Sequence, residues 1–274
     1  MKKYLIGCLL IALFSVTKSQ TIISLSDYEG HSKLKKIAVK IEGVNYNFLF
    51  DTGAGVTLIS PEVAKKINRR EYGRSVGYRM LGEKVEYAKC DSVEVLIGDY
   101  KFFHSTVGVW DLNQVLPKGW PKIDGVISLG SFQGQCVTLD LSANTITVES
   151  DSTCRTKTNS MQLVESRFVN GFTGLETGIF LNLDQVGRKW WFLMDSGNLD
   201  KNKISHTTAK EWNIKSTADS GRVDMGNVNY KLAGISKDLP TVADEIIYDG
   251  VLNFDFLSQI IITLSFAEEK VWIK

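Results

Sequence analysis

The sequence predicts a mostly β protein made of two homologous lobes. Its 274 residues include 43% hydrophobic and 23% charged residues, an ordinary globular composition whose length suits two closely joined domains. Two segments of the first half recur in the second half. Short apolar or alternating runs, bounded by Gly, Asp and Asn, favour β-strands along most of the chain.

The repeat is clearest at the end of each half. Residues 124–148, DGVISLGSFQGQCVTLDLSANTITV, align without a gap with residues 249–273, DGVLNFDFLSQIIITLSFAEEKVWI. Earlier in each half, residues 47–53 (NFLFDTG) match residues 191–197 (WFLMDSG). The repeat spans about half of the chain, far more than a solenoid unit, so two homologous lobes are the simplest explanation.

Local patterns place strands and helices within each half. We expect strands in the short apolar or alternating runs 34–41, 47–50, 92–97, 137–141 and 190–194. A short helix is expected over 61–67, because Ser60 can act as its N-cap and Pro61 fits its first position. Its counterpart, 206–212, follows Ser205.

The N-terminus predicts export. Lys2 and Lys3 precede an apolar run over 4–16, and small residues follow before Gln20, so residues 1–19 are expected to be a cleaved signal peptide. The run is shorter than the roughly 20 residues that span a bilayer. Leu5–Cys8 has the letters of a lipoprotein cleavage box, but almost no apolar segment precedes it. We expect a periplasmic or secreted protein with no membrane span in the mature chain.

The domain prediction follows from these boundaries. The N-terminal lobe is expected over 20–148 and the C-terminal lobe over 163–274, with a polar linker without periodicity over 149–162. Three cysteines remain after cleavage, Cys90, Cys136 and Cys154, which allow at most one disulfide and leave its pairing open.

Charge and residue spacing exclude several function classes. The net charge is +1 with both signs interspersed, so no nucleic-acid partner is expected. No Cys or His residues have metal-ligand spacing, and no metal or other cofactor is expected. One Gly-x-Ser-x-Gly string, residues 73–77, lacks a preceding buried strand and is interpreted as a chance match in a loop.

One hairpin is expected in the first half alone. The segment from Asp51 to the turn at Gly98 is longer than the segment from Asp195 to Gly226, which we take as the corresponding turn. The additional residues lie around 78–87 and predict a β-hairpin with its tip near Gly82.

The two Asp-(Thr/Ser)-Gly tripeptides carry the functional prediction. A single such tripeptide is a common turn, but here each follows a buried-looking strand within a repeat. Two lobes related by an approximate two-fold axis would bring Asp51 and Asp195 together. Carboxylates about 3 Å apart share a proton and can act as general base and general acid. Gly53 and Gly197 would allow the close approach, and the hydroxyls of Thr52 and Ser196 could bond across the lobe interface. Which aspartate carries the proton stays open.

These motifs resemble the pepsin-like and retropepsin-like aspartic proteases, and most closely the bacterial two-lobe aspartyl proteases. The matching segments are FLFDTGAGVTLIS, FLMDSGNLDKNKIS and the two Asp-Gly-Val segments. The resemblance implies two double-ψ acid-protease barrels with an active-site cleft between them, and the hairpin resembles the flap that closes over peptide. It implies an aspartic endopeptidase that hydrolyses an extended peptide or protein substrate with apolar side chains around the scissile bond. The implied site comprises the catalytic Asp51 and Asp195, the turn residues Thr52, Gly53, Ala54, Ser196, Gly197 and Asn198, and the flap residues Met80, Leu81 and Gly82.

The chain departs from the pepsin pattern in three places. Ala54 and Asn198 stand where pepsins have Ser or Thr, so fewer hydroxyl donors favour higher dyad pKa values and activity at mildly acidic or neutral pH. The loop after Asn198 is one residue longer than its counterpart. Leu81 replaces the Tyr that precedes the flap-tip Gly. The second turn is thus the one that departs more.

Two alternatives remain. A protein of the same fold could bind extended peptides by strand pairing and cleave them weakly or not at all. The second alternative is an obligate dimer of the retropepsin kind. However, two aspartate motifs in one chain make a second copy unnecessary, so a monomer is expected.

Overall fold

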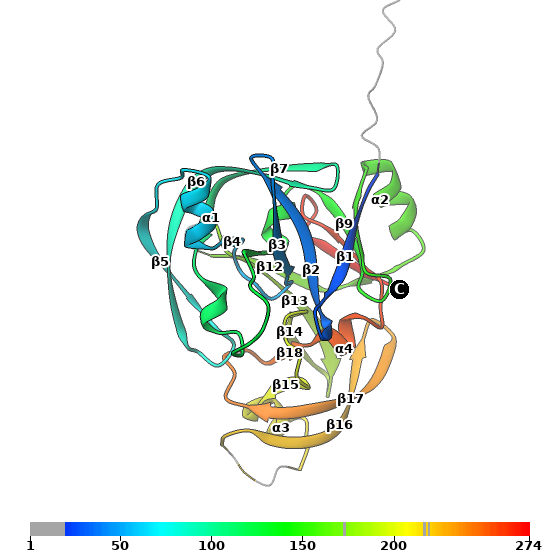
Figure 1. Cartoon of the computed structure of the whole chain (residues 1–274). Coiled ribbons are helices and arrows are strands. Elements are labelled where there is room, and N and C mark those ends of the chain that lie inside the picture. Colours follow the sequence, from blue (N-terminus) through cyan, green and yellow to red (C-terminus); the bar gives the residue numbers. More distant parts are fainter. Residues whose placement is uncertain (1–19, 172–173, 216–217, 219) are drawn as a thin grey trace, which may run out of the picture.

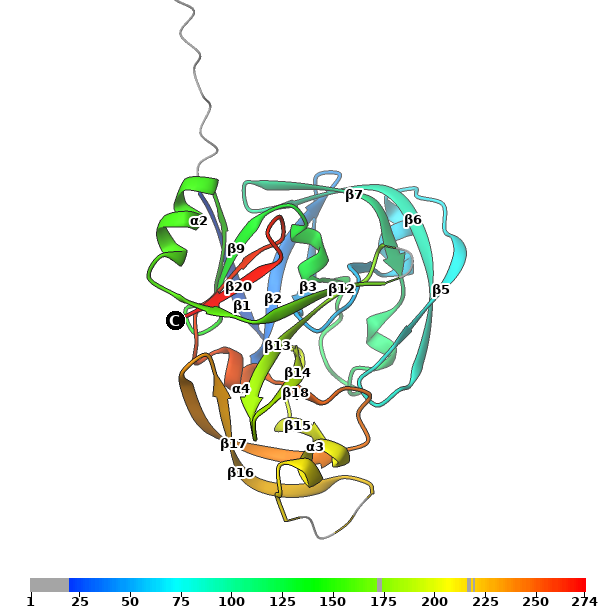
Figure 2. The ribbon, with the colours of Figure 1, turned by 180° about the vertical axis from the view of Figure 1, so that it is seen from behind.

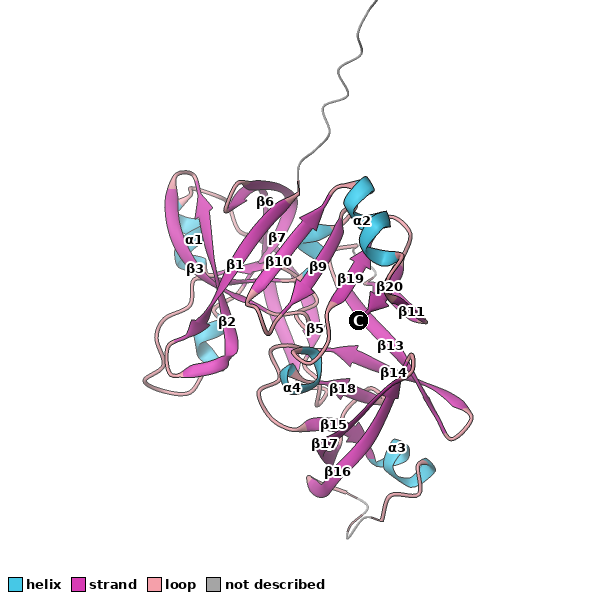
Figure 3. Ribbon diagram, turned by 90° about the vertical axis from the view of Figure 1, so that its right-hand side faces the viewer, coloured by secondary structure: helices cyan, strands magenta, loops and turns pink. Residues whose placement is uncertain are grey.

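The computed structural model describes residues 20–171, 174–215, 218 and 220–274. The predicted signal peptide, residues 1–19, lies outside the described residues. Strands form most of the protein and divide into two lobes, with the short helices at the periphery (Figures 1 and 3). The prediction of a mostly β, two-lobed fold is confirmed.

The first half contains β1 to β10, helix α1 and two 3₁₀ turns. Their bounds are β1 (Thr21–Tyr28), β2 (His31–Ile41), β3 (Val44–Phe50), β4 (Leu58–Ile59), α1 (Pro61–Lys66), β5 (Tyr72–Tyr78), β6 (Lys84–Ile97), β7 (Tyr100–Val109), η1 (Leu112–Gln114), β8 (Gly125–Ile127), η2 (Leu129–Phe132), β9 (Cys136–Asp140) and β10 (Thr145–Glu149).

Helix α2 follows, and the second half contains β11 to β20 with two further helices. Their bounds are α2 (Asp151–Thr158), β11 (Gln162–Val164), β12 (Ser166–Asn170), β13 (Thr177–Gln185), β14 (Arg188–Met194), β15 (Asn202–Ser205), α3 (His206–Glu211), β16 (Val223–Leu232), β17 (Ile235–Asp244), β18 (Gly250–Leu252), α4 (Phe254–Leu257), β19 (Ile262–Ser265) and β20 (Lys270–Ile273).

The same substructure recurs in both lobes. Strand β3 pairs in parallel with β8, and β14 pairs in parallel with β18 in the matching register. The carboxylates of Asp124 and Asp249 accept hydrogen bonds from the backbone N–H groups of Asn47 and Trp191, both at 2.9 Å. The Ser60 and Ser205 side chains cap α1 and α3 as expected. The repeat in the sequence is therefore a repeat in three dimensions.

A central sheet joins the two lobes. Its strands run in the order β11–β20–β19–β9–β10–β1 and continue into the sheet of the first lobe (Figure 3). At its middle, Thr138 of β9 pairs with Thr263 of β19, and these residues occupy equivalent places in the repeat. Most of the buried apolar residues of both lobes belong to one contiguous core, and smaller clusters lie apart from it. The lobes are thus packed as one body.

The predicted linker contains a helix. Ser150 accepts a hydrogen bond from the Thr153 N–H and so caps α2. The sequence lacked helical periodicity because only Cys154 of this helix is buried. Cys154 forms a disulfide with Cys136, while Cys90 is a buried free thiol. Among the described residues, no helix combines the length and apolar character needed to cross a membrane.

The predicted hairpin is present, with two corrections. Strands β5 and β6 form it, and Gly82 adopts φ +83° at its tip. Residues 73–77 lie within β5 and not in a loop, because the hairpin is longer than the predicted 78–87. The turn that corresponds to Gly98 is Ala233–Gly234; Gly226 instead lies at a bulge within β16, where its φ of +66° is accommodated. The described part of the second lobe holds no counterpart of this hairpin.

Candidate active site

Asp51 and Asp195 begin equivalent turns at the interface of the lobes. Asp51 follows β3, and its N–H donates to the carbonyl of Ile127 at 3.1 Å. Asp195 follows β14, and its N–H donates to the carbonyl of Leu252 at 3.0 Å. Ile127 is the last residue of β8 and Leu252 the last residue of β18, the parallel partners of β3 and β14. The buried sheets therefore fix where both turns start.

The structure brings the two carboxyl groups together through the two glycines. The N–H groups of Gly53 and Gly197 donate to the same Asp51 oxygen, Oδ1, at 2.8 and 3.1 Å. A methyl group on Gly53 would lie 2.4 Å from Cγ of Asp195, and one on Gly197 would lie 2.5 Å from Oδ2 of Asp51. Each turn therefore needs glycine so that the aspartate of the other lobe can approach.

The hydroxyls of Thr52 and Ser196 cross the interface. The Thr52 N–H donates to Oγ of Ser196 at 3.0 Å, and the Ser196 N–H donates to Oγ1 of Thr52 at 2.9 Å. Oγ1 of Thr52 in turn donates to the carbonyl of Met194 at 3.1 Å. Both residues are buried, so these bonds form without competition from water. They hold the two turns in one fixed arrangement.

Burial raises the pKa of both aspartates. For Asp51, desolvation is opposed chiefly by the hydrogen bonds from the Gly53 and Gly197 N–H groups. For Asp195, desolvation raises the pKa well above its usual value, and the negative charge of Asp51 raises it further. The Asn198 N–H, 3.0 Å from Oδ1 of Asp195, partly compensates. Two such carboxyls favour a state in which the pair shares one proton.

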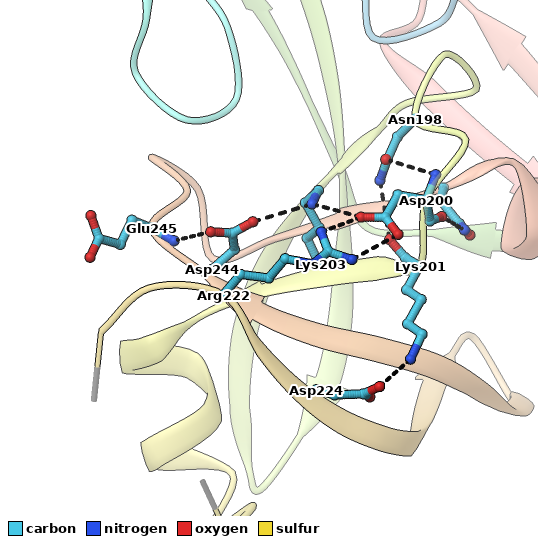
Figure 4. Close-up of polar contacts among 9 residues, drawn as sticks. Asn198, Asp200, Lys201, Lys203, Arg222, Asp224, Asp244 and Glu245 are labelled. Atoms are coloured by element: carbon cyan, nitrogen blue, oxygen red, sulfur yellow. Dashed lines mark hydrogen bonds and ion pairs between the residues drawn. The ribbon is translucent and has the colours of Figure 1, made fainter. Parts of the chain in front are cut away.

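The two residues that follow the glycines have different environments. Ala54 packs against a buried apolar cluster of the first lobe that includes Leu58 and Tyr87. Asn198 is buried, and its side chain bonds to its own loop: Nδ2 donates to the Lys201 carbonyl, and Oδ1 accepts from the Asp200 N–H, both at 3.3 Å. Asn198 therefore supports the longer second loop from behind (Figure 4).

Sequence reasoning missed a cluster of charged residues behind the second turn, shown in Figure 4. Asp200 accepts from Nη2 of Arg222 at 2.9 Å and from Nζ of Lys203 at 3.1 Å. Lys203 is buried and also donates to Asp244 at 3.3 Å. The Arg222 hydrogen bond is the main cause that holds the pKa of Asp200 far below its usual value. The close spacing of Asp200, Lys201 and Lys203 along the chain does not distinguish them from surface charges.

The predicted flap residues lie at the hairpin tip, against the second lobe. The Ile247 N–H donates to the carbonyl of Met80 at 3.0 Å, and Met80 packs against the buried cluster of Leu193, Ile246 and Val251. Leu81, in contrast, is 44% exposed. A second contact between the lobes was also missed: the Tyr87 hydroxyl donates to Glu176 at 2.5 Å. In the described part of the chain, no group of His, Cys, Asp and Glu is arranged to hold a metal ion.

This fold and paired-aspartate geometry define the two-lobed class of acid-protease folds. In agreement, residues 37–130, within the first lobe, match the model of a family described as aspartyl protease. Basic 7S globulin from soybean has a similar structure, with a TM-score of 0.56 at 8% sequence identity over 93% of this chain and 95% of that one. That similarity shows the pepsin-like fold of the whole chain. No curated protein sequence matches.

Proposed function

We propose that this chain is an aspartic endopeptidase in which Asp51 and Asp195 activate a water molecule. The observation that carries the proposal is the reciprocal packing of each aspartate on the glycine of the other turn. The family match covers Asp51 but ends before Asp195. The assignment of Asp195 therefore rests on the geometry of the second turn.

The chemistry follows from the shared proton. The ionised carboxylate of the pair accepts a proton from water as the water oxygen attacks the peptide carbonyl carbon, and the protonated carboxyl donates its proton to the carbonyl oxygen. When the tetrahedral intermediate collapses, the C–N bond breaks and the leaving nitrogen takes a proton from the pair. The bonds of Thr52 and Ser196 keep the carboxyls in place throughout. The substrate would be an extended peptide with apolar side chains around the scissile bond.

The test is cleavage of a mixed peptide library by the wild type, Asp51→Asn and Asp195→Asn, read by mass spectrometry across pH. We expect each variant to lose at least about a thousandfold in kcat/KM, since neither remaining carboxyl can supply both acid and base. Wild-type cleavage should be sensitive to pepstatin. Because burial raises both aspartate pKa values, activity should peak at mildly acidic or neutral pH. Equal, near-zero cleavage by all three proteins would instead indicate a peptide-binding protein.

We also propose export and the division into lobes at 20–148 and 163–274. The disulfide between Cys136 and Cys154 is consistent with an oxidising compartment such as the periplasm or the extracellular space. N-terminal sequencing of the mature protein from a secreting host tests the export proposal, with Gln20 as the expected first residue. A mature protein that begins at Met1 would contradict it.

A further inference from the structure

The tip of the flap is held by a short loop of the second lobe, between β17 and β18. The Ile247 N–H donates to the Met80 carbonyl at 3.0 Å, and a methyl on Gly82 would lie 3.5 Å from Cγ2 of Ile247. In Figure 2 the β5–β6 hairpin reaches down to this orange segment. Leu81 and Ile247 nevertheless remain 44% and 52% exposed. A contact with this much exposed surface, held by the backbone hydrogen bond from Ile247 to Met80, can open locally.

The Met80 side chain is partly buried against an apolar cluster of the second lobe. It packs against Leu193, Ile246 and Val251, and the rings of Phe180 and Tyr248 border the same cluster with their centroids 5.3 Å apart. Leu193 precedes Asp195 by two residues in β14. Burial, and after it the charge of Asp195, raises the pKa of Tyr248. This second-lobe cluster is therefore within electrostatic reach of Asp195.

We infer that Met80 is a displaceable plug: it occupies the apolar position beside Asp195 that a side chain of the bound peptide must take. The inference rests on the proposed function, since it concerns peptide binding at that site. Methionine is unbranched and flexible, so it can fill an irregular gap and leave it without rearranging the walls. Two side chains cannot occupy the position together, so a peptide gains only the difference between its own burial and that of Met80.

The plug makes Met80 a specificity-determining residue. A large apolar side chain of the peptide regains, by its own burial, the free energy that Met80 loses when it leaves the position. An alanine buries too little apolar surface to replace Met80. The apparent affinity is also reduced by the fraction of protein in which the plug is in place. Removal of the plug should therefore strengthen binding, the opposite of what removal of a contact residue does.

The test compares Met80→Ala and Met80→Leu with the wild type in calorimetric titrations of peptides whose scissile amide is reduced to CH₂–NH, so that they are not cleaved. The peptides carry Leu or Ala at each of the two positions that flank this reduced bond in turn. Met80→Ala should bind the Leu peptide about five- to tenfold more tightly than the wild type at one of the two positions, and change less than about twofold with the Ala peptide. Met80→Leu, which keeps the plug, should resemble the wild type.

A control variant and a ligand-free measurement complete the design. Leu163→Ala removes an exposed leucine of edge strand β11 and should leave all affinities unchanged. In the wild type, the ¹³C-labelled methyl of Met80, assigned by its loss in Met80→Leu, should resonate away from the position of exposed methionines and move there when the Leu peptide binds.

The outcomes separate this inference from the proposed function. The plug alone is overturned if the wild type cleaves the library but Met80→Ala binds no peptide more tightly than the wild type. The same holds if Met80→Ala gains equally in affinity for the Leu and the Ala peptides. A Met80 methyl at the exposed position without ligand does the same. Absence of cleavage and of peptide binding in every variant overturns both proposals.

Discussion

The two aspartate turns make the same contacts across the lobe interface, here called the front, but different residues support them on the opposite side, here called the back. At the front, Thr52 and Ser196 make matching bonds across the interface. Behind them, Leu58 and Lys203 occupy equivalent positions, because Leu58 pairs with Val126 and Lys203 with Val251 in the two copies of the substructure. Leu58 belongs to an apolar cluster, whereas Lys203 is buried between two carboxylates.

The difference shows that one backbone arrangement can be supported in two physical ways. An apolar cluster supports the first turn by shape and by exclusion of water. The second turn depends on directional ionic contacts, which are favourable in the interior only while every charge has a partner. Lys203 also reaches Asp244, the last residue of β17, just before the loop that holds the flap. The second turn and the flap thus share a support that the first turn lacks.

The largest effect is expected from substitutions that disrupt the symmetric contacts between the two turns. Gly53→Ala and Gly197→Ala each force a methyl to within 2.4–2.5 Å of the opposite aspartate, so each should reduce kcat/KM at least about a thousandfold. The matched control is Gly55→Ala in the same turn, whose methyl would lie at an ordinary 3.7 Å from Glu176. A library assay that finds the three variants equally active would contradict the reciprocal packing.

The next largest effect is expected from substitutions in the ionic contacts that support only the second turn. Lys203→Met leaves Arg222 with Asp200 but removes the ion-pair partner of the buried Asp244, which keeps the hydrogen bond from the Glu245 N–H. This change should destabilise the protein by about 3 kcal/mol in urea unfolding. The double variant Lys203→Leu/Asp244→Leu, which makes the second back apolar like the first, should recover most of this loss. If the single variant loses no more than the double variant, the ionic support is unimportant.

A smaller effect would show which aspartate is in the less favourable environment for charge. A carboxyl whose pKa is raised by folding binds its proton more tightly in the native state, so its contribution to stability is full below the ordinary pKa of 3.8 and is lost as pH rises. Asp195→Asn should therefore raise Tm by a few degrees at pH 7 and by little at pH 3. Asp51→Asn should gain less, because Asp51 accepts bonds from both Gly53 and Gly197. Calorimetric scans that place the larger gain at Asp51 would reverse this order.

The sequence predicted what the repeat encodes. Residues 47–53 and 191–197 carry the buried strand, the aspartate and the glycine in the same order, and Ser60 and Ser205 encode the caps of the following helices. These are local patterns with a definite physical cause. The hairpin tip at Gly82 was found for the same reason, since glycine tolerates its positive φ.

What the sequence did not reveal depends on distant partners. The pairing of Lys203 with Asp244 and that of Tyr87 with Glu176 join segments 41 and 89 residues apart, and no local pattern distinguishes these residues from surface charges. Gly226 was mistaken for a hairpin turn because a bulge and a turn both favour glycine. Asn198 looked like a departure beside the dyad, but tertiary packing turns its amide into its own loop.

The pairing of Thr138 with Thr263 has a consequence for assembly. Their hydroxyls lie 2.9 Å apart. On either side of this pair, Leu139 pairs with Ile262 and Val137 with Leu264, so each pair joins the same two positions of the repeat with the halves exchanged. This is the pattern at the centre of a symmetric dimer interface. The single chain therefore has the architecture of two fused subunits. Separately expressed halves, cut within 149–162, should associate through these strands, and neither half should complete its central sheet alone. Because β20 (Lys270–Ile273) pairs with β11 and β19, that sheet closes only after both halves have been synthesised.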